Sequence, residues 1–305
     1  MKIDIKELLS KTQEELRRFV ICKLAELGYE KDMVFTKDYV FAKGNIPVLL
    51  VAHLDTVHKD LPIIFHDENK KALWSPQGIG GDDRCGVYAI LKICQELKPY
   101  VLFTTDEEIG AVGAEKFAQE INGKLLKKVN FAIEIDRRGF NEAVFYDCGN
   151  NEFQEFILSF GFDEEIGSFS DICMLSPKFD FASVNLSAGY YNEHTNYEYI
   201  MLDHLEYTIC LVKKILQNEG SFKRYEYDEV PKIYKYDKAY WDAYYDSLKM
   251  KEVDKKSFFN DGVVNDNTLL MMENDYNNMT EKEWFEKYQF EKPNSIDEIC
   301  YGDMY

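Results

Sequence analysis

The sequence predicts an α/β fold, namely a three-layer α/β/α sandwich around a mixed, mostly parallel central sheet. Two observations support this class. From residue 46 onward, short apolar runs typical of buried strands alternate with segments whose apolar residues recur at helical spacing. The chain also has 305 residues, 46% of them hydrophobic, which is enough to form a sizeable core.

The first part of the chain is expected to contain a helix, two hairpins and a buried strand. Thr12 and Glu15 form a capping-box signal, and apolar residues then recur at helical spacing until Gly28 ends the helix. Alternating apolar residues predict hairpins, and one continuous apolar run predicts a buried strand. In chain order, the expected elements are a helix over 12–28, a hairpin over 33–44, a strand over 46–52 and a hairpin over 62–76.

Beyond this point the chain alternates between helices and strands. A glycine-rich turn over 78–86 leads into an apolar helix. The apolar runs that follow are short, as in buried strands of a parallel sheet. The expected order is a helix over 87–97, a strand over 100–105, a helix over 114–121, a strand over 130–136, a further apolar stretch over 142–148, a helix over 151–160, a strand over 181–189 and a helix over 202–216.

Composition restricts the partners and the location of the protein. The formal net charge of −19 should repel nucleic-acid phosphates and anionic membrane surfaces, so neither partner is expected. Charged residues interrupt every apolar run near the N-terminus, and no stretch approaches the roughly 20 apolar residues of a membrane span. Seven cysteines without a CxxC pair predict reduced thiols. A cytoplasmic protein is therefore expected.

The composition changes near residue 220, which predicts two units. Residues 1–220 contain the alternating elements, whereas the 85 residues from Ser221 hold eleven of the 21 tyrosines and show little periodicity. We interpret residues 221–305 as an acidic, tyrosine-rich extension of unknown fold. Whether it covers the first unit or a partner subunit of a homo-oligomer stays open.

Acidic residues and histidines follow the ends of five consecutive elements. Ligands of such sheets bind beyond the carboxyl ends of the strands, so these side chains are expected at one edge. Each of them alone would usually be a surface or structural residue, and their common position is what indicates a site. They are His53 and Asp55, Asp82 and Asp83, Asp106 to Glu108, Asp136, and His194.

This concentration of carboxylates predicts bound cations. Neighbouring carboxylates repel one another, and divalent cations remove that repulsion. Histidine together with Asp and Glu suits Zn²⁺, and also Mn²⁺ or Co²⁺. Two such ions can activate one water molecule between them. The expected cofactors are therefore two divalent metal ions, with Zn²⁺ first.

Five motifs resemble those of a known clan. They are HLDTV at 53–57, GGDDRCG at 80–86, DEEIGAVGA at 106–114, EID at 134–136 and EHTNYE at 193–198. In order and spacing they are similar to the motif series of the dinuclear zinc peptidase clan, which includes the M20, M28 and M42 metallopeptidases. The intervals between the motifs are too short for the inserted domains of M20 and M42 enzymes. The resemblance thus implies a zinc exopeptidase-like catalytic domain over 1–220 without an inserted lid domain.

The resemblance also implies a role for each site residue. His53 and Asp136 would bind one metal ion, and Glu108 and His194 the other, with Asp82 shared between them. Four further expectations concern a proton acceptor, a residue that orients a ligand, a cis peptide bond and a supporting carboxylate. Glu107 would be the general base, Asp55 would orient the ring of His53, the Asp82–Asp83 peptide bond would be cis, and Glu198 would support the site or begin a helix.

Three functions follow from this resemblance. The first is a metal-dependent exopeptidase, in particular an aminopeptidase acting on short peptides. The second is an N-acyl amino-acid deacylase or similar amidohydrolase, which applies the same chemistry to an acylated amino acid. The third is a non-catalytic binding relative, and the presence of every expected ligand together with Glu107 argues against it.

Overall fold

The computed structural model describes residues 3–230, and its centre is an eight-stranded mixed sheet. Four adjacent strands in the middle run parallel, while both edges include antiparallel neighbours. This confirms the predicted mixed, mostly parallel sheet. Across the sheet the order is β1 (Met33–Phe35), β2 (Tyr39–Ala42), β6 (Pro99–Thr104), β3 (Ile46–His53), β7 (Phe131–Arg137), β10 (Ala182–Ser187), β8 (Glu142–Val144) and β9 (Asp163–Glu165).

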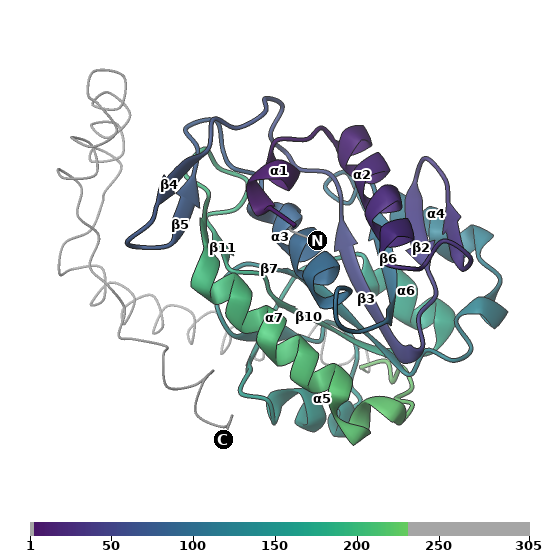
Figure 1. Ribbon diagram of the computed structural model, residues 1–305. Helices are drawn as coiled ribbons and strands as arrows, with labels where there is room; N and C mark the ends of the chain where they lie inside the picture. Colours follow the sequence, from purple (N-terminus) through teal and green to yellow (C-terminus); the bar gives the residue numbers. More distant parts are fainter. Residues whose placement is uncertain (1–2, 231–305) are drawn as a thin grey trace, which may run out of the picture. The chain divides into compact units, whose positions relative to one another are not determined.

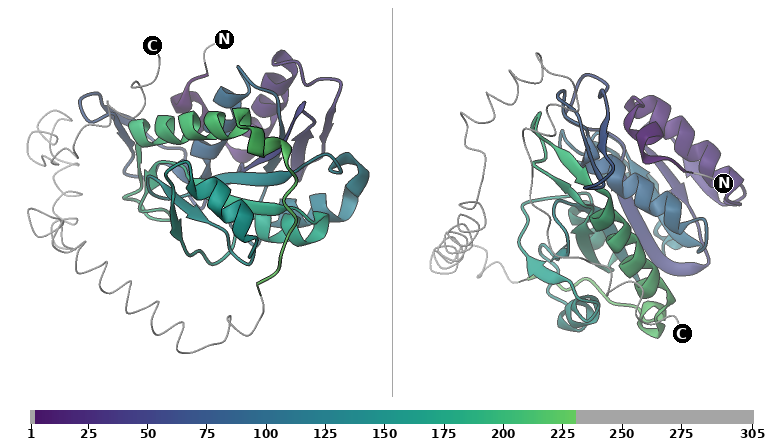
Figure 2. Two further views of the ribbon diagram at one scale, coloured as in Figure 1. Left: turned by 90° about the horizontal axis from the view of Figure 1, so that it is seen from below. Right: turned by 60° about the vertical axis from the view of Figure 1, so that its left-hand side comes forward.

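Helices cover both faces of this sheet, as expected for a three-layer sandwich (Figure 1). Figure 2 shows α3 and α7 side by side on one face, and their residues are in contact. On that face lie α1 (Ile5–Leu9), α2 (Gln13–Glu26), α3 (Gly81–Ile93) and α7 (Leu202–Gln217). On the other lie α4 (Val112–Glu120) and α6 (Ile172–Phe179), which pack against each other. Near one end of the sheet, α5 (Asn151–Leu158) contacts Phe131 through Phe153.

A large apolar cluster lies between the sheet and the α4–α6 pair. Alternate residues of the central strands point into it, because successive side chains of a strand face opposite sides. From β3 these are Leu49 and Val51, and both are fully buried. Aromatic rings of Phe41 and Phe117 pack against each other with centroids 5.4 Å apart. This rigid layer supports the strand ends described below.

A smaller antiparallel sheet stands beside the main one. Its strands are β11 (Tyr190–Tyr191), β12 (Tyr199–Met201), β5 (Ala72–Trp74) and β4 (Phe65–Asp67). The predicted hairpin over 62–76 is therefore present, as is the predicted hairpin over 33–44. The strands β11 and β12 were not predicted, since two or three residues are too few to show alternation. They matter because the turn between them carries His194.

Two helices differ from the expectation. The helix α3 begins at Gly81 and ends at Ile93, several residues earlier than the predicted 87–97, and Asp82 and Asp83 within it have non-helical backbone angles. The helix α6 was not predicted, because Pro177 interrupts its apolar pattern. From Asp136 to His194 the described chain contains no inserted lid domain, as expected.

The first compact unit extends to Glu229, and a second begins at Val230. The predicted boundary at 220 falls short of this division because residues 221–229 pack on the first unit. Tyr225 is buried, its ring stacks on Phe156, and its carbonyl oxygen accepts a 2.8 Å hydrogen bond from Ala182 N. The rest of the predicted extension lies outside the described residues. Within residues 3–230 all six cysteines are unpaired, and no helix has the length and apolarity to span a membrane.

Candidate metal centre

The register of the parallel strands brings the predicted side chains to one edge. His53, the last residue of β3, pairs with Thr104 at the end of β6. On the other side of β3, Val51 pairs with Glu134, so Asp136 reaches the same level as His53. The loop after β6 contributes Glu108 to this edge. The sheet edge therefore assembles groups that are far apart in the sequence.

Asp82 lies at the centre of the cluster. It lies in the non-helical start of α3, shortly after Gly80, whose backbone is left-handed with φ of +68°, and the peptide bond from Asp82 to Asp83 is cis as predicted. One carboxylate oxygen of Asp82 lies 3.0 Å from His53 Nε2, and the other lies 3.2 Å from His194 Nε2. The two oxygens thus face two different imidazole rings.

Each imidazole ring has one further carboxylate beside it. His53 Nε2 lies 3.4 Å from Asp136 Oδ1, and His194 Nε2 lies 3.0 Å from Glu108 Oε2. The five predicted ligands therefore form two groups that share Asp82. We refer to His53 and Asp136 as the inner group, and to His194 and Glu108 as the outer group.

Asp83 also lies near the inner group, although it was not predicted as a ligand. Ligand atoms of His53, Asp83 and Asp136 lie within 4.8 Å of one another, as do those of His53, Asp82 and Glu108. However, Asp83 already accepts hydrogen bonds from His53 N at 3.3 Å and Gly86 N at 2.9 Å. These bonds occupy both of its oxygens, so its main contact is with the backbone around the site.

Asp55 connects the inner group to the loop after β6. Its Oδ1 lies 3.1 Å from His53 Nδ1, which leaves Nε2 of that ring facing Asp82. The same carboxylate accepts hydrogen bonds of 3.0 Å from the backbone N–H groups of Glu107 and Glu108. One buried side chain therefore orients a histidine and positions two glutamates.

The electrostatics of the cluster fit bound cations. Burial, reinforced by the charge of Asp82, raises the pKa of Glu108 to about 7 and that of Asp136 well above its usual range. The hydrogen bond to Asp82 raises the pKa of His194 to about 9. Glu108 Oε1 is buried and has no hydrogen-bond partner among the described residues. A buried oxygen without a donor, in a mixed His and carboxylate set, matches what a divalent cation requires.

Glu107 lies beside this cluster with its backbone held by Asp55. Burial raises the pKa of its carboxyl group, and the charges of Asp82 and Asp55 act in the same direction. A carboxylate whose pKa is raised toward neutrality is a better proton acceptor at neutral pH.

A second buried carboxylate fixes the glycine turn that carries Asp82. Glu198 accepts hydrogen bonds of 2.9 Å from both Gly80 N and Asp82 N, and it lies 2.8 Å from His58 Nε2. The prediction considered Glu198 as a supporting residue or a helix start, and the structure shows it supporting the turn. His58 was not predicted to take part, because its partner Glu198 is 140 residues away in the sequence.

Comparison with known proteins identifies the relatives of this arrangement. The sequence model of peptidase family M28 matches residues 40–156, a segment that includes every predicted site residue except His194 and Glu198. No curated protein matches the sequence significantly. The fold is similar to that of a tripeptidase from Staphylococcus aureus subsp. aureus Mu50, with a TM-score of 0.56 and 15% identity over 70% of this chain and 96% of that one.

Two further solved structures show the same likeness. Aminopeptidase PepT from Bacillus cereus ATCC 10987 has a TM-score of 0.55 and 14% identity over 70% of this chain and 96% of that one. An aminopeptidase from the archaeon Desulfurococcus kamchatkensis has a TM-score of 0.53 and 16% identity over 72% of this chain and 95% of that one. The predicted resemblance to the dinuclear zinc peptidase clan is confirmed. The fold is therefore similar to that of these solved peptidases.

Proposed function

We propose that this protein is a metal-dependent exopeptidase that removes the amino-terminal residue from short peptides. The position of Asp82 carries the proposal, because its two oxygens face His53 and His194 separately. A carboxylate in that position suits two neighbouring metal ions better than one. The M28 match and the aminopeptidases and tripeptidase of similar fold support the same chemistry.

The inner group would hold one ion and the outer group the other, with Asp82 shared. Zn²⁺ suits this donor set best, and Mn²⁺ and Co²⁺ are alternatives. When bound, such ions lower the pKa of a water molecule and polarise the carbonyl group of the scissile bond. Asp55 keeps a hydrogen bond to Nδ1 of His53 and thereby directs Nε2 of the ring into the site.

Glu107 performs the proton transfers in this proposal. Its carboxylate takes a proton from the attacking water as the water oxygen bonds to the carbonyl carbon. When the C–N bond breaks, Glu107 returns that proton to the departing amine nitrogen, so the base is restored. The hydrogen bond from Glu107 N to Asp55 fixes the backbone from which this side chain extends.

Metal analysis and a substrate panel test the proposal together. We expect native mass spectrometry to find two divalent ions per chain, and short peptides with a free amino terminus to be hydrolysed. Glu107→Gln should retain both ions and lower kcat by roughly 10²–10⁴-fold, because only the proton acceptor is lost. Glu115→Gln on α4 is the matched control, because the Glu115 side chain is exposed and its hydrogen-bond partner is Gln119, outside the site. An unchanged kcat for Glu107→Gln would exclude Glu107 as the base.

The same panel distinguishes the other functions. Hydrolysis confined to N-acylated amino acids would show that the protein is a deacylase and not an aminopeptidase. Full metal content with no hydrolysis of either substrate class would instead indicate a non-catalytic relative.

A further inference from the structure

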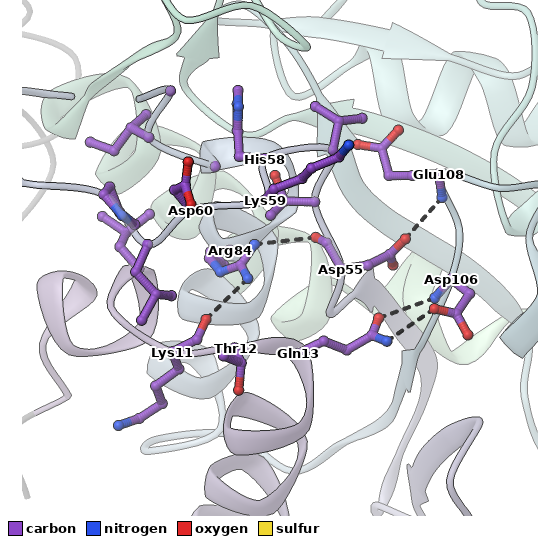
Figure 3. A pocket seen from close by; sticks show the side chains of 18 of the residues that line it. Lys11, Thr12, Gln13, Asp55, His58, Lys59, Asp60, Arg84, Asp106 and Glu108 are labelled. Carbon is purple, nitrogen blue, oxygen red and sulfur yellow. Dashed lines mark hydrogen bonds between the residues drawn. The ribbon is translucent and has the colours of Figure 1, made fainter. Parts of the chain in front are cut away.

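A cavity of about 530 Å³ opens beside the metal centre (Figure 3). Its walls come from four segments that are distant in sequence, and Asp55 and Glu108 belong to both the cavity and the site. A substrate bound at the metal centre would therefore extend into this space. The segments are the chain around 9–13, the loop 55–62, the turn 78–80 and the loop around 106–109, with Arg84 also lining the cavity.

Arg84 contributes a buried positive charge to this cavity. Only 4% of the residue is exposed, and its Nη1 and Nη2 donate to the backbone carbonyl oxygens of Asp55 and Lys11 at 3.3 and 3.2 Å (Figure 3). Its Nε has no partner, and within residues 3–230 no carboxylate forms an ion pair with it. Buried charges are normally paired, because an isolated one is costly to remove from water. The hydrogen-bond acceptors of Arg84 are neutral carbonyl groups, while the charges of Asp55, Glu198, Asp83 and Asp82 act on it without direct contact.

Thr56 adds a second polar group without a partner. Its Oγ1 is buried and forms no hydrogen bond to another described residue. A methyl group placed on Gly80 would lie 3.2 Å from Thr56 Oγ1 and 3.4 Å from Arg84 Nη1. Both polar groups therefore border the same space, which the absence of a side chain at Gly80 leaves open.

The acidic residues of the wall form no ion pair with Arg84, although the charge of Asp55 acts on its guanidinium. Asp55 accepts hydrogen bonds from Glu107 N and Glu108 N, and Asp106 Oδ1 accepts one of 3.0 Å from Gln13 Nε2. Asp60 is exposed, and the same is true of its neighbour Lys59. The unpartnered N–H of Arg84 and hydroxyl group of Thr56 can each donate a hydrogen bond to an acceptor such as a carboxylate.

Exposed apolar side chains also line the cavity, beside the exposed charged residues Lys59 and Asp60. Val57, Leu61 and Ile109 are 41%, 50% and 76% exposed. A ligand that fits this space has an apolar or neutral body and one anionic end.

We propose that this cavity is a carboxylate-binding subsite, in which Arg84 and Thr56 bind a carboxylate of the peptide substrate. The proposal rests on the peptidase function given above. The carboxylate can come from the C-terminus of a short peptide or from an acidic side chain. Arg84 suits either, because its planar guanidinium matches the geometry of a carboxylate.

Two pairs of peptides separate these sources in the wild-type protein. Leu-Gly-Gly is compared with its C-terminal amide, and Leu-Glu-amide is compared with Leu-Gln-amide. We expect one carboxylate peptide to exceed its neutral partner in kcat/KM by at least about tenfold, as for a hydrogen bond between charged groups. A ratio close to one in both pairs would overturn the subsite.

Variants connect that preference to the residues. Arg84→Met should bring the carboxylate-to-amide ratio close to one, whereas a purely structural role would lower the rates of both peptides equally. Thr56→Val removes only the hydroxyl group and should reduce the carboxylate-to-amide ratio several-fold. This second variant tests the subsite even if Arg84→Met does not fold. Arg18→Met on α2 is the matched control because Arg18 is exposed and does not line the cavity. A ratio unchanged in the folded variants would contradict the proposal.

A binding measurement separates this proposal from the peptidase function. Calorimetry with D-Leu-Gly-Gly and its amide reports the carboxylate preference without turnover. Preferential binding of the acid in a protein that hydrolyses no peptide would support the subsite and refute the peptidase. Hydrolysis of peptides together with equal binding of the acid and the amide would support the peptidase function and refute the subsite.

Discussion

The inner and outer groups of the metal centre have the same chemistry but different surroundings. Each combines one histidine and one carboxylate with a shared oxygen ligand, Asp82. The His53 side chain is 1% exposed, whereas that of His194 is 52% exposed. His53 ends a central strand, while His194 lies in a turn with a left-handed backbone, φ +63°. His53 is therefore part of the protein core and His194 lies at its surface, whereas the carboxylates Asp136 and Glu108 are equally buried, each with its side chain 9% exposed.

This difference indicates that the two groups serve separate purposes. Side chains at the ends of packed strands keep their geometry without a ligand, because neighbouring strands hold them. A turn on the surface opens at lower free-energy cost. We therefore expect the ion of the inner group to bind more tightly, and the ion of the outer group to exchange more readily.

Replacing each histidine in turn gives the largest contrast. In chelator-treated protein, His53→Ala should lower the free energy of unfolding by about 3 kcal/mol, because it leaves the buried Asp55 without its charged partner. His194→Ala should lower it by less, about 1 kcal/mol, because the side chain that pairs with Asp82 and Glu108 is half exposed. Urea unfolding measures both values.

The metal content of the same variants provides the second readout. We expect His194→Ala to retain one ion by native mass spectrometry after brief dialysis. Equal destabilisation by the two variants, or loss of both ions from His194→Ala, would refute the distinction between the groups.

Asp55→Ala tests the residue that connects the inner group with the loop carrying Glu107 and Glu108. The substitution removes the partner of His53 Nδ1 and two backbone hydrogen bonds, so metal affinity should fall by roughly 10–100-fold while both ions still bind at saturation. Competition with a fluorescent zinc chelator measures the affinity. Complete loss of one ion at saturating metal would show that Asp55 is a direct ligand.

Much of the fold and site could be predicted because the signals are local. The buried strand ending at His53 is one continuous apolar run, and the carboxyl-edge rule then locates the side chain after it. The same reasoning applies to Asp136 after β7. These positions depend only on residues that are close in sequence, so periodicity was sufficient to find them.

The hydrogen-bond partners of the supporting residues could not be predicted from local patterns because they are distant in sequence, although the family resemblance indicates a supporting role for Glu198. Asp82 and Glu198 are 116 residues apart, and nothing in either neighbourhood marks their hydrogen bond. Arg84 looks like an ordinary charged residue near the start of a helix, yet it is almost fully buried. Likewise, five residues of α1 are too few to establish a helical period.

Glu198→Gln should give the smallest of these effects. The variant keeps one carbonyl oxygen but loses the acceptor for either Gly80 N or Asp82 N, so the turn carrying the shared ligand becomes less constrained. We expect metal affinity and kcat/KM to fall together by roughly tenfold, the cost of about one charge-assisted hydrogen bond. Glu206→Gln on α7 is the matched control, because its hydrogen-bond partner is Tyr88 and not the turn. A loss of kcat/KM with unchanged affinity would place Glu198 nearer the substrate, whereas no change in either would show that packing alone holds the turn.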